Sequence, residues 1–509
     1  MTRQGLFTLL TGLAFISTPA CVVDKNKVET PDEAPAPAPE EKVAERVYPD
    51  PPPPEDPRPV NFPELQQMKL PNGLAVYVVE NHEVPLVDVQ LVFKTGSIDD
   101  ELRADMTADI LLEGTGGKKG LSKAEINERI EQVGSSLDAG AGRFTTTIGT
   151  RVLKPDLDMA LELVSKVAME PKMDPKALDK LKDAAKVDLR NQKSTGQALG
   201  SRLLGQILYP EGHPYGRPFS TDEQIDAITV DDLKKYHETF YVSNNAYLIL
   251  SGDITLDEVK ASVEKTLGKM KPAQEFPEHP LAKFTAEDYQ KAKPEKIVIH
   301  LVDRKSISTE IFVANLSLAR NHADWIKWTM VNKILGAGVS SRLFQDIRET
   351  KDLTYGIGST VVPAKGIGSF VIATQTKFVD EMMDALFDHI DRIREEDPTQ
   401  KEFDQAKNAL SLSFPLTIES AGQVANMVDT QLTYGLPENY FATYRDEVLK
   451  VEMNDVKATA AKWIDPTPVI VMVGRKRKIL SALANVEELK DAEVIVYDTD
   501  LKKIETTKP

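Results

Sequence analysis

A short acidic segment near residue 105 has the spacing that helices use to hold a metal ion. Asp105, Ala108 and Asp109 stand at positions i, i+3 and i+4, so they share one face if the segment is helical. Hydrolysis by zinc at this spacing requires nitrogen ligands and a glutamate that activates water. Two short carboxylates and a methyl group cannot supply these groups. The segment therefore has the spacing of a catalytic helix without its chemistry.

The elements around this segment predict an α+β fold, in which mostly antiparallel sheets are covered by helices. Apolar or alternating runs predict strands, and runs of helical period predict helices. Strands come before helices instead of alternating with them, which argues against a regular βαβ order. The predicted strands are 74–79, 87–94, 144–153, 297–302, 310–318 and 369–373, and the predicted helices are 103–112, 156–168, 176–192, 323–335 and 379–394.

The body of the chain resembles a duplication with an offset of roughly 220 residues. Asp174–Lys186 resembles Asp397–Leu410, and both predict the start of a helix. Near the end of each half, an amphipathic helix precedes an apolar strand that ends in glycine. We therefore expect two domains, 62–272 and 297–509, joined by a polar linker, 273–296.

The N-terminus has the features of a bacterial lipoprotein signal. Arg3 precedes an apolar run from Gly5 to Ile16, and S-T-P-A-C follows it. We expect residues 1–21 to be a signal peptide and Cys21 to be lipidated; an ordinary signal peptide with an incidental cysteine is the alternative. Proline-rich residues 22–61 predict a disordered tether. The expected location is the periplasmic face of the bacterial cell envelope, with a lipid anchor in the membrane.

Composition excludes several classes of function for this chain of 509 residues. A net charge of −17 argues against nucleic acid as a partner. A single cysteine excludes disulfides within the chain and metal sites built from cysteines. No two of the seven histidines stand at i, i+3 or i+4, so no local histidine metal site is predicted.

Five ordered motifs carry a family resemblance. They are L-P-N-G-L-A-V-Y-V-V-E-N, F-K-T-G-S-I-D-D-E, L-L-E-G-T, H-P-Y-G-R-P at 213–218, and I-L-G-A-G-V-S-S-R-L-F-Q-D-I-R-E-T-K-D-L-T-Y-G-I at 334–357. Together they resemble the M16 (pitrilysin/insulinase-type) zinc peptidases, in the branch with bacterial and mitochondrial processing peptidases. This resemblance implies two homologous M16-type (LuxS/MPP-like) domains.

The resemblance implies that the zinc motif is degenerate. Counting back from Gly114-Thr115, the family's His-x-x-Glu-His falls on Asp105, Ala108 and Asp109, and its third ligand falls near Asp188. Three carboxylates would suit a hard cation such as magnesium or calcium, but Ala108 leaves no general base. We therefore favour the interpretation that these positions are acidic residues on a partly solvated helix and not a metal site. We expect no metal in this chain, with zinc held by a partner subunit.

The second half retains a pair that some M16 members place opposite the zinc. By resemblance, Arg348 and Tyr355 hold the scissile carbonyl and stabilise the developing oxyanion in trans. The structural alternative is a solvated helix arginine beside Glu349 and a tyrosine packed on the core. Gly336 and Gly338 predict a turn into a helix N-terminus, because no phosphate-loop Lys follows.

The sequence therefore predicts the non-zinc subunit of a two-chain M16 peptidase. The partner would be a zinc-bearing M16 subunit, and the two chains would enclose extended peptides held partly by strand addition. The chain would be inactive alone. A structural or peptide-binding homodimer that lacks catalysis is the second hypothesis. An active peptidase with a substitute metal is the third.

Overall fold

A mixed sheet of six strands forms the centre of the first half. Its order is β1-β2-β6-β3-β5-β4, and only the β2–β6 pair is parallel. The strands are β1 (Leu65–Lys69), β2 (Ala75–Glu80), β3 (Leu86–Phe93), β4 (Leu137–Ala141), β5 (Thr146–Leu153) and β6 (Ala246–Gly252). The computed structural model describes residues 62–509 except 294. The predicted signal peptide, Cys21 and the tether lie outside the described residues.

The second half repeats this sheet with one more strand. Its order is β13-β12-β7-β11-β8-β10-β9. The strands are β7 (Val298–Asp303), β8 (Thr309–Ser317), β9 (Thr354–Val362), β10 (Gly368–Thr376), β11 (Val469–Gly474), β12 (Glu493–Tyr497) and β13 (Lys503–Thr507). The central orders β2-β6-β3-β5-β4 and β7-β11-β8-β10-β9 match, and β2 and β7 begin 223 positions apart. The strand order agrees with the predicted duplication and the α+β class.

Helices cover both sheets. The first half contains α1 (Glu101–Leu111), α2 (Lys123–Glu131), α3 (Leu157–Met169), α4 (Pro175–Ser194), α5 (Gly196–Leu208), α6 (Asp222–Ala227), α7 (Val230–Phe240), α8 (Leu256–Thr266) and α9 (Ala286–Ala292). The second contains α10 (Trp325–Leu335), α11 (Val379–Glu395), α12 (Gln400–Leu412), α13 (Ala421–Tyr434), α14 (Tyr440–Lys450), α15 (Met453–Trp463) and α16 (Lys476–Leu483). Within the described part of the chain, no helix is long and apolar enough to cross a membrane.

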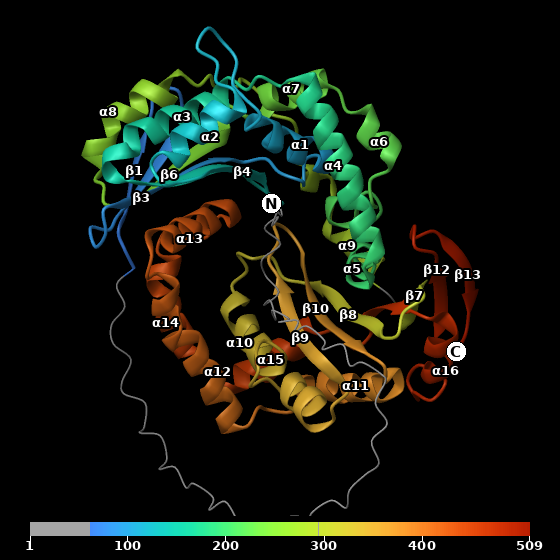
Figure 1. Cartoon of the computed structure of the whole chain (residues 1–509). Coiled ribbons are helices and arrows are strands. Elements are labelled where there is room, and N and C mark those ends of the chain that lie inside the picture. Colours follow the sequence, from blue (N-terminus) through green and yellow to red (C-terminus); the bar gives the residue numbers. More distant parts are fainter. Residues whose placement is uncertain (1–61, 294) are drawn as a thin grey trace, which may run out of the picture. The chain divides into compact units, whose positions relative to one another are not determined.

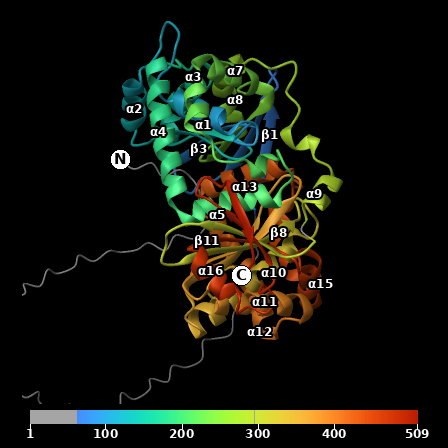
Figure 2. The ribbon, with the colours of Figure 1, turned by 90° about the vertical axis from the view of Figure 1, so that its right-hand side faces the viewer.

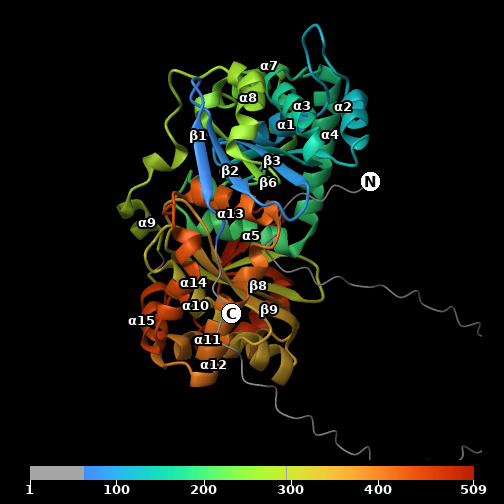
Figure 3. The ribbon, with the colours of Figure 1, turned by 90° about the vertical axis from the view of Figure 1, so that its left-hand side faces the viewer.

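The two halves exchange one helix each. Figure 1 shows α3 and α8 on one face of the first sheet and α13, from the second half, on the other. In return, α5 packs on β8 and β11 of the second sheet, and both exchanged helices lie between the sheets in Figures 2 and 3. The α13 contacts are made by Val424, Ala425 and Val428 against Val92, Tyr247 and Ile249. The α5 contacts are made by Leu199, Leu203 and Leu204 against Phe312, Val471 and Val473. Each half thus completes the core of the other.

A glycine permits the close approach of α5 to the second sheet. A Cβ atom added at Gly200 would lie 2.2 Å from the Phe312 ring. Because such overpacking costs about 1–3 kcal/mol, we expect Gly200→Ala to lower the free energy of unfolding by about that amount in a urea titration. Gly268→Ala is the matched control, since a Cβ there meets nothing within 4 Å. If Gly200→Ala leaves the free energy of unfolding unchanged, α5 can shift away from Phe312 without loss of stability.

Candidate functional site

Helix α1 carries the acidic segment, as the sequence predicts. Asp100 caps its N-terminus by accepting a hydrogen bond of 2.9 Å from the Arg103 backbone N–H. The helix packs beside β4, α4 and α7. On its surface, Asp105 is exposed, Asp109 is half-buried and Ala108 is 1% exposed. The predicted face exists, and its central position points a methyl group into the protein.

The structure brings the acidic positions of α1 and α4 into electrostatic range of one another. The surrounding protein removes water from the Asp105 carboxyl and, with Glu101, Asp109 and Asp188 close by, raises its pKa to about 7. Part of the Asp105 surface is nevertheless exposed, so solvent screens part of this effect. Asp188 accepts a hydrogen bond of 2.7 Å from Gln192 on the same helix. The residues near the family's ligand positions are therefore neighbours.

These neighbours do not form a metal site. Among the residues that the structure describes, no group of three or more His, Cys, Asp or Glu side chains is placed to hold an ion. The donor set is also wrong for zinc, because imidazole nitrogens are absent and Ala108 cannot activate water. We therefore assign no metal-dependent step to this chain.

The raised pKa of Asp105 predicts a stability that depends on pH. The folded state holds this proton more tightly than the unfolded state, whose pKa is near 3.8. Stability should therefore fall as pH rises from about 4 to about 7. We expect Asp105→Asn to raise the free energy of unfolding by about 1 kcal/mol at pH 8, a value limited by solvent screening. Near pH 3 it should have little effect.

The control for this prediction is Asp179→Asn, which removes one exposed charge from α4. Urea titrations of both variants at the two pH values measure the effect. Equal changes in the free energy of unfolding of the two variants would assign the effect to net charge. A lower free energy of unfolding of Asp105→Asn at pH 8 would contradict the prediction.

Arg348 and Tyr355 lie together at one edge of the second sheet. Arg348 belongs to η6 (Phe344–Thr350), a π-helical segment that continues directly into the loop before β9. Its Nε donates a hydrogen bond of 2.9 Å to the Tyr355 carbonyl oxygen. Its guanidinium carbon lies 4.7 Å from the centre of the Phe344 ring, and its Nη1 forms an ion pair with Glu349. The arginine is thereby held in place beside the tyrosine.

The Tyr355 side chain is open to solvent. The residue is 90% exposed, and its hydroxyl has no hydrogen-bond partner among the described residues. It stands near the start of β9, which is an edge strand. The alternative of a tyrosine packed on the core is therefore wrong, whereas Arg348 does pair with Glu349, as the alternative expects for the arginine. An exposed phenol and a fixed guanidinium at an open sheet edge can donate hydrogen bonds to a bound carbonyl.

The two glycines before η6 form the predicted turn. Gly336 follows α10, and Gly338 has φ +111°, a conformation that favours glycine. A Cβ at Gly336 would lie 2.4 Å from the Ser359 Oγ on β9. The turn fixes η6, and with it Arg348, against the edge strand.

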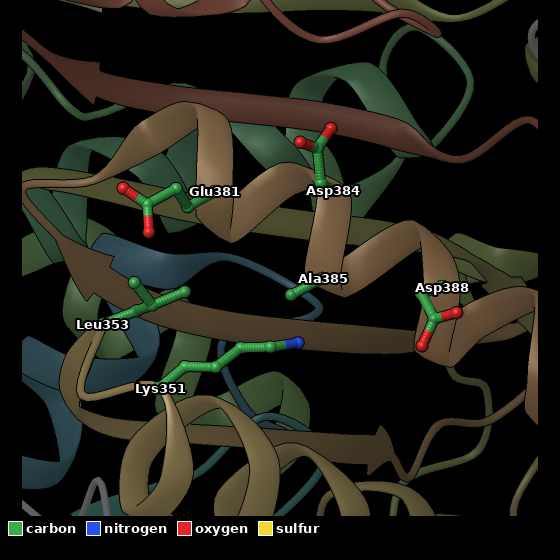
Figure 4. Close-up of a pocket in the computed structure, with 6 residues that line it drawn as sticks. All are labelled: Lys351, Leu353, Glu381, Asp384, Ala385 and Asp388. Carbon is green, nitrogen blue, oxygen red and sulfur yellow. The ribbon is translucent and has the colours of Figure 1, made fainter.

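A pocket of about 440 Å³ lies between α11 and the loop that leads to Tyr355 (Figure 4). It is lined by Lys351, Leu353, Glu381, Asp384, Ala385 and Asp388. Figure 4 shows that its acidic groups come from one face of α11, while Lys351 extends below them. Lys351 is bonded to Asp346 at 2.6 Å. Three acids at helical spacing within 379–394 were a signal for this pocket, but no local motif marked it in the sequence.

Two family models match the chain in succession. The model described as "Insulinase (Peptidase family M16)" matches residues 75–217, and "Peptidase M16 inactive domain" matches residues 227–410. The chain belongs to peptidase family M16. The resemblance that the sequence motifs indicate is thereby confirmed.

Relatives and solved structures extend the match over most of this M16 chain. A Helicobacter pylori protein called "Non-peptidase homolog YmxG" is 26% identical over 82% of this chain and 94% of its own. A Streptomyces coelicolor protein called "Uncharacterized zinc protease SCO5738" is 23% identical over 70% of this chain and 78% of its own. The structure of a Pseudomonas fluorescens peptidase M16 inactive domain superposes with a TM-score of 0.71 at 26% identity, over 81% and 98%. A Helicobacter pylori protease shares the fold with a TM-score of 0.71 at 18% identity, over 81% and 100%.

Proposed function

We propose that this chain is the non-zinc subunit of a two-chain M16 peptidase. In this proposal a zinc-bearing M16 partner supplies the metal and the general base. Arg348 and Tyr355 of this chain bind and polarise the scissile carbonyl of an extended peptide. The exposure of Tyr355 carries the proposal, because a tyrosine retained for packing would be buried.

The loss of the metal site supports inactivity of the chain alone. Asp105, Ala108 and Asp109 provide no zinc ligand set on α1. The Helicobacter pylori relative is also called a non-peptidase homolog. Arg348 and Tyr355, in contrast, are both present, and Arg348 donates a hydrogen bond to the Tyr355 carbonyl oxygen on the edge strand.

The edge strands support an extended peptide as the substrate. β4 and β9 are each at the end of a sheet, so one side of their backbone is open to pairing. β4 lies beside α1, and β9 begins beside Arg348. A peptide added to such an edge would present its carbonyls in a fixed register.

The proposal places the protein at the periplasmic face of a bacterial membrane. There Cys21 would carry the lipid and residues 22–61 would act as the tether, which are the roles predicted from the sequence. Palmitate labelling of the full chain and of a Cys21→Ser variant tests the anchor, and equal labelling would contradict it.

Mixing tests the division of labour. The full chain is purified from its native host with the proteins bound to it, and its M16 partner is identified and expressed. We expect no peptide hydrolysis by this chain alone and hydrolysis, sensitive to chelators, on mixing. If the mixture is no more active than the partner alone, the alternative of an inactive structural or peptide-binding homodimer is favoured. Hydrolysis by this chain alone would contradict both.

A further inference from the structure

Three cations gather where the two halves meet. Lys94 directly follows β3, Arg143 lies in the turn between β4 and β5, and Lys365 lies in the turn between β9 and β10. Arg143 stands three residues before β5, and Lys365 stands three residues before β10. The two turns are equivalent in the duplication, so the second and third cations occupy matching positions. We call these residues the three-cation cluster.

Each cation of the cluster lies over an aromatic ring. The Lys365 Nζ is 5.0 Å from the centre of the Phe144 ring, beside Arg143 in the sequence. The Arg143 guanidinium carbon is 4.9 Å from the Tyr215 ring, whose hydroxyl donates to the Lys365 carbonyl at 2.9 Å. These contacts tie the two turns together and fix the cations.

The third cation, Lys94, also lies near an aromatic ring, and two acids, Asp99 and Asp429, lie close to the cluster. The Lys94 Nζ lies 5.9 Å from the Tyr247 ring, and the Tyr247 hydroxyl donates to Asp429 at 2.6 Å. Asp99 accepts hydrogen bonds from Thr95 and from the Gly96 backbone. Asp429 is largely withdrawn from water, which raises its pKa. Both acids are therefore engaged by other donors.

No carboxylate of the described residues forms an ion pair with Lys94, Arg143 or Lys365. Loss of water and repulsion from Lys94 lower the pKa of Lys365, although Asp99 and Asp429 oppose this. Asp99 and Asp429, the two acids that act on Lys365, both accept hydrogen bonds from other donors. In a chain of net charge −17, cations that are held over aromatic rings without an ion-pair partner indicate a place for a negatively charged group from outside.

We propose that the three-cation cluster binds a carboxylate of the peptide held by this protein. The inference rests on the proposed function in taking the ligand to be a peptide, and its distance from the scissile bond rests on the role proposed for Tyr355. A carboxylate supplies a negative charge to the cluster, and Arg143 can bind both of its oxygens. A phosphate would bring a second charge close to Asp99 and Asp429.

The position of the cluster predicts how far along the peptide the bound carboxylate lies from the scissile bond. Strand β9 runs from Thr354 to Val362, so Tyr355 lies near one end and Lys365 lies just beyond the other. A peptide paired along this edge advances about 3.3 Å per residue. The recognised carboxylate should therefore lie on the order of ten residues from the carbonyl that Tyr355 contacts.

Binding of matched peptides to the full chain alone tests the proposal. Three fluorescent peptides share one neutral sequence, and they end in an amide, end in a free carboxylate, or end in an amide with one internal glutamate. We expect the wild type to bind at least one carboxylate peptide about tenfold more tightly than the neutral amide, measured by anisotropy. The preferred peptide identifies the source of the carboxylate, and the preference should decline with added salt.

The variant Arg143→Gln/Lys365→Gln should bind all three peptides equally. Lys118→Gln/Lys260→Gln is the control, because it removes two exposed lysines that have no ion pair among the described residues. Arg143→Lys/Lys365→Arg should retain the preference, which separates charge from fold. Equal wild-type binding of all peptides, no measurable binding, or the same loss in the control would overturn the proposal.

The outcome is distinguishable from failure of the proposed function. Arg348→Ala should keep the carboxylate preference, because Arg348 lies at the opposite end of β9. If the wild-type chain shows no preference for a carboxylate but its mixture with the M16 partner hydrolyses peptides, only the role of the three-cation cluster is rejected. If the wild-type chain shows the preference but the mixture is inactive, only the catalytic partnership is rejected.

Discussion

Arg348→Ala or Tyr355→Phe should lower kcat/KM of the mixture with the zinc-bearing subunit by about 10²–10³-fold. Tyr355→Phe removes one hydroxyl from a side chain that is 90% exposed, so the fold should not change. The lost group is a donor that would stabilise charge on the scissile oxygen. Steady-state hydrolysis of a fluorogenic peptide by the mixture measures the effect.

Arg348 should show a more complex response than Tyr355. Its Nε holds the Tyr355 carbonyl at 2.9 Å, so Arg348→Ala removes a donor and also loosens the start of β9. Arg348→Lys keeps the charge but cannot keep both interactions, and its activity should fall between wild type and Arg348→Ala. The double variant should lose less than the product of the two single effects, because the residues act together.

Assembly must be measured beside activity. Both variants should form the complex with the same apparent mass as wild type in size-exclusion chromatography with light scattering. Arg392→Ala, an exposed arginine on α11, is the control and should leave hydrolysis unchanged. Full activity of both variants, with the complex intact, would reject the roles assigned to Arg348 and Tyr355.

Local patterns explain why much of the site was predictable. Helix α1 begins at an Asp cap and ends before a glycine at φ +142°, and both signals are local. The pairing of Arg348 with Tyr355 depends on a spacing of seven residues within one motif. The sequence did not reveal that η6 is π-helical or that the contact runs through the tyrosine carbonyl, because both depend on packing against β9.

Features built from distant residues were not predictable from one sequence. Helix α5 contains Gly196, Gly200 and Gly205, which lower helix propensity and obscure its period. Its close packing against Phe312 is what requires a small residue at position 200. The three-cation cluster joins Lys94 to Lys365 through the fold alone, and no local pattern links them.

Restoring the family's ligands should give this chain a zinc site. In the variant Asp105→His/Asp109→His/Asp188→Glu, two imidazoles stand one turn apart on α1, and a longer carboxylate stands on α4, which packs beside it. The wild-type structure shows that these positions already influence one another electrostatically. We expect zinc at 100 times its dissociation constant to stabilise the variant by about 2.7 kcal/mol and to leave the wild type unchanged.

The third ligand and the base can be tested separately. The variant Asp105→His/Asp109→His/Asp188→Ala should bind zinc at least tenfold more weakly than the triple variant, because it lacks the third ligand. The triple variant should remain inactive, since Ala108 provides no general base. If zinc leaves the thermal midpoint of the triple variant unchanged, α1 and α4 do not hold the geometry of a zinc peptidase. Zinc binding without hydrolysis would show that this M16 chain keeps the scaffold of the metal site and lacks only its reactive groups.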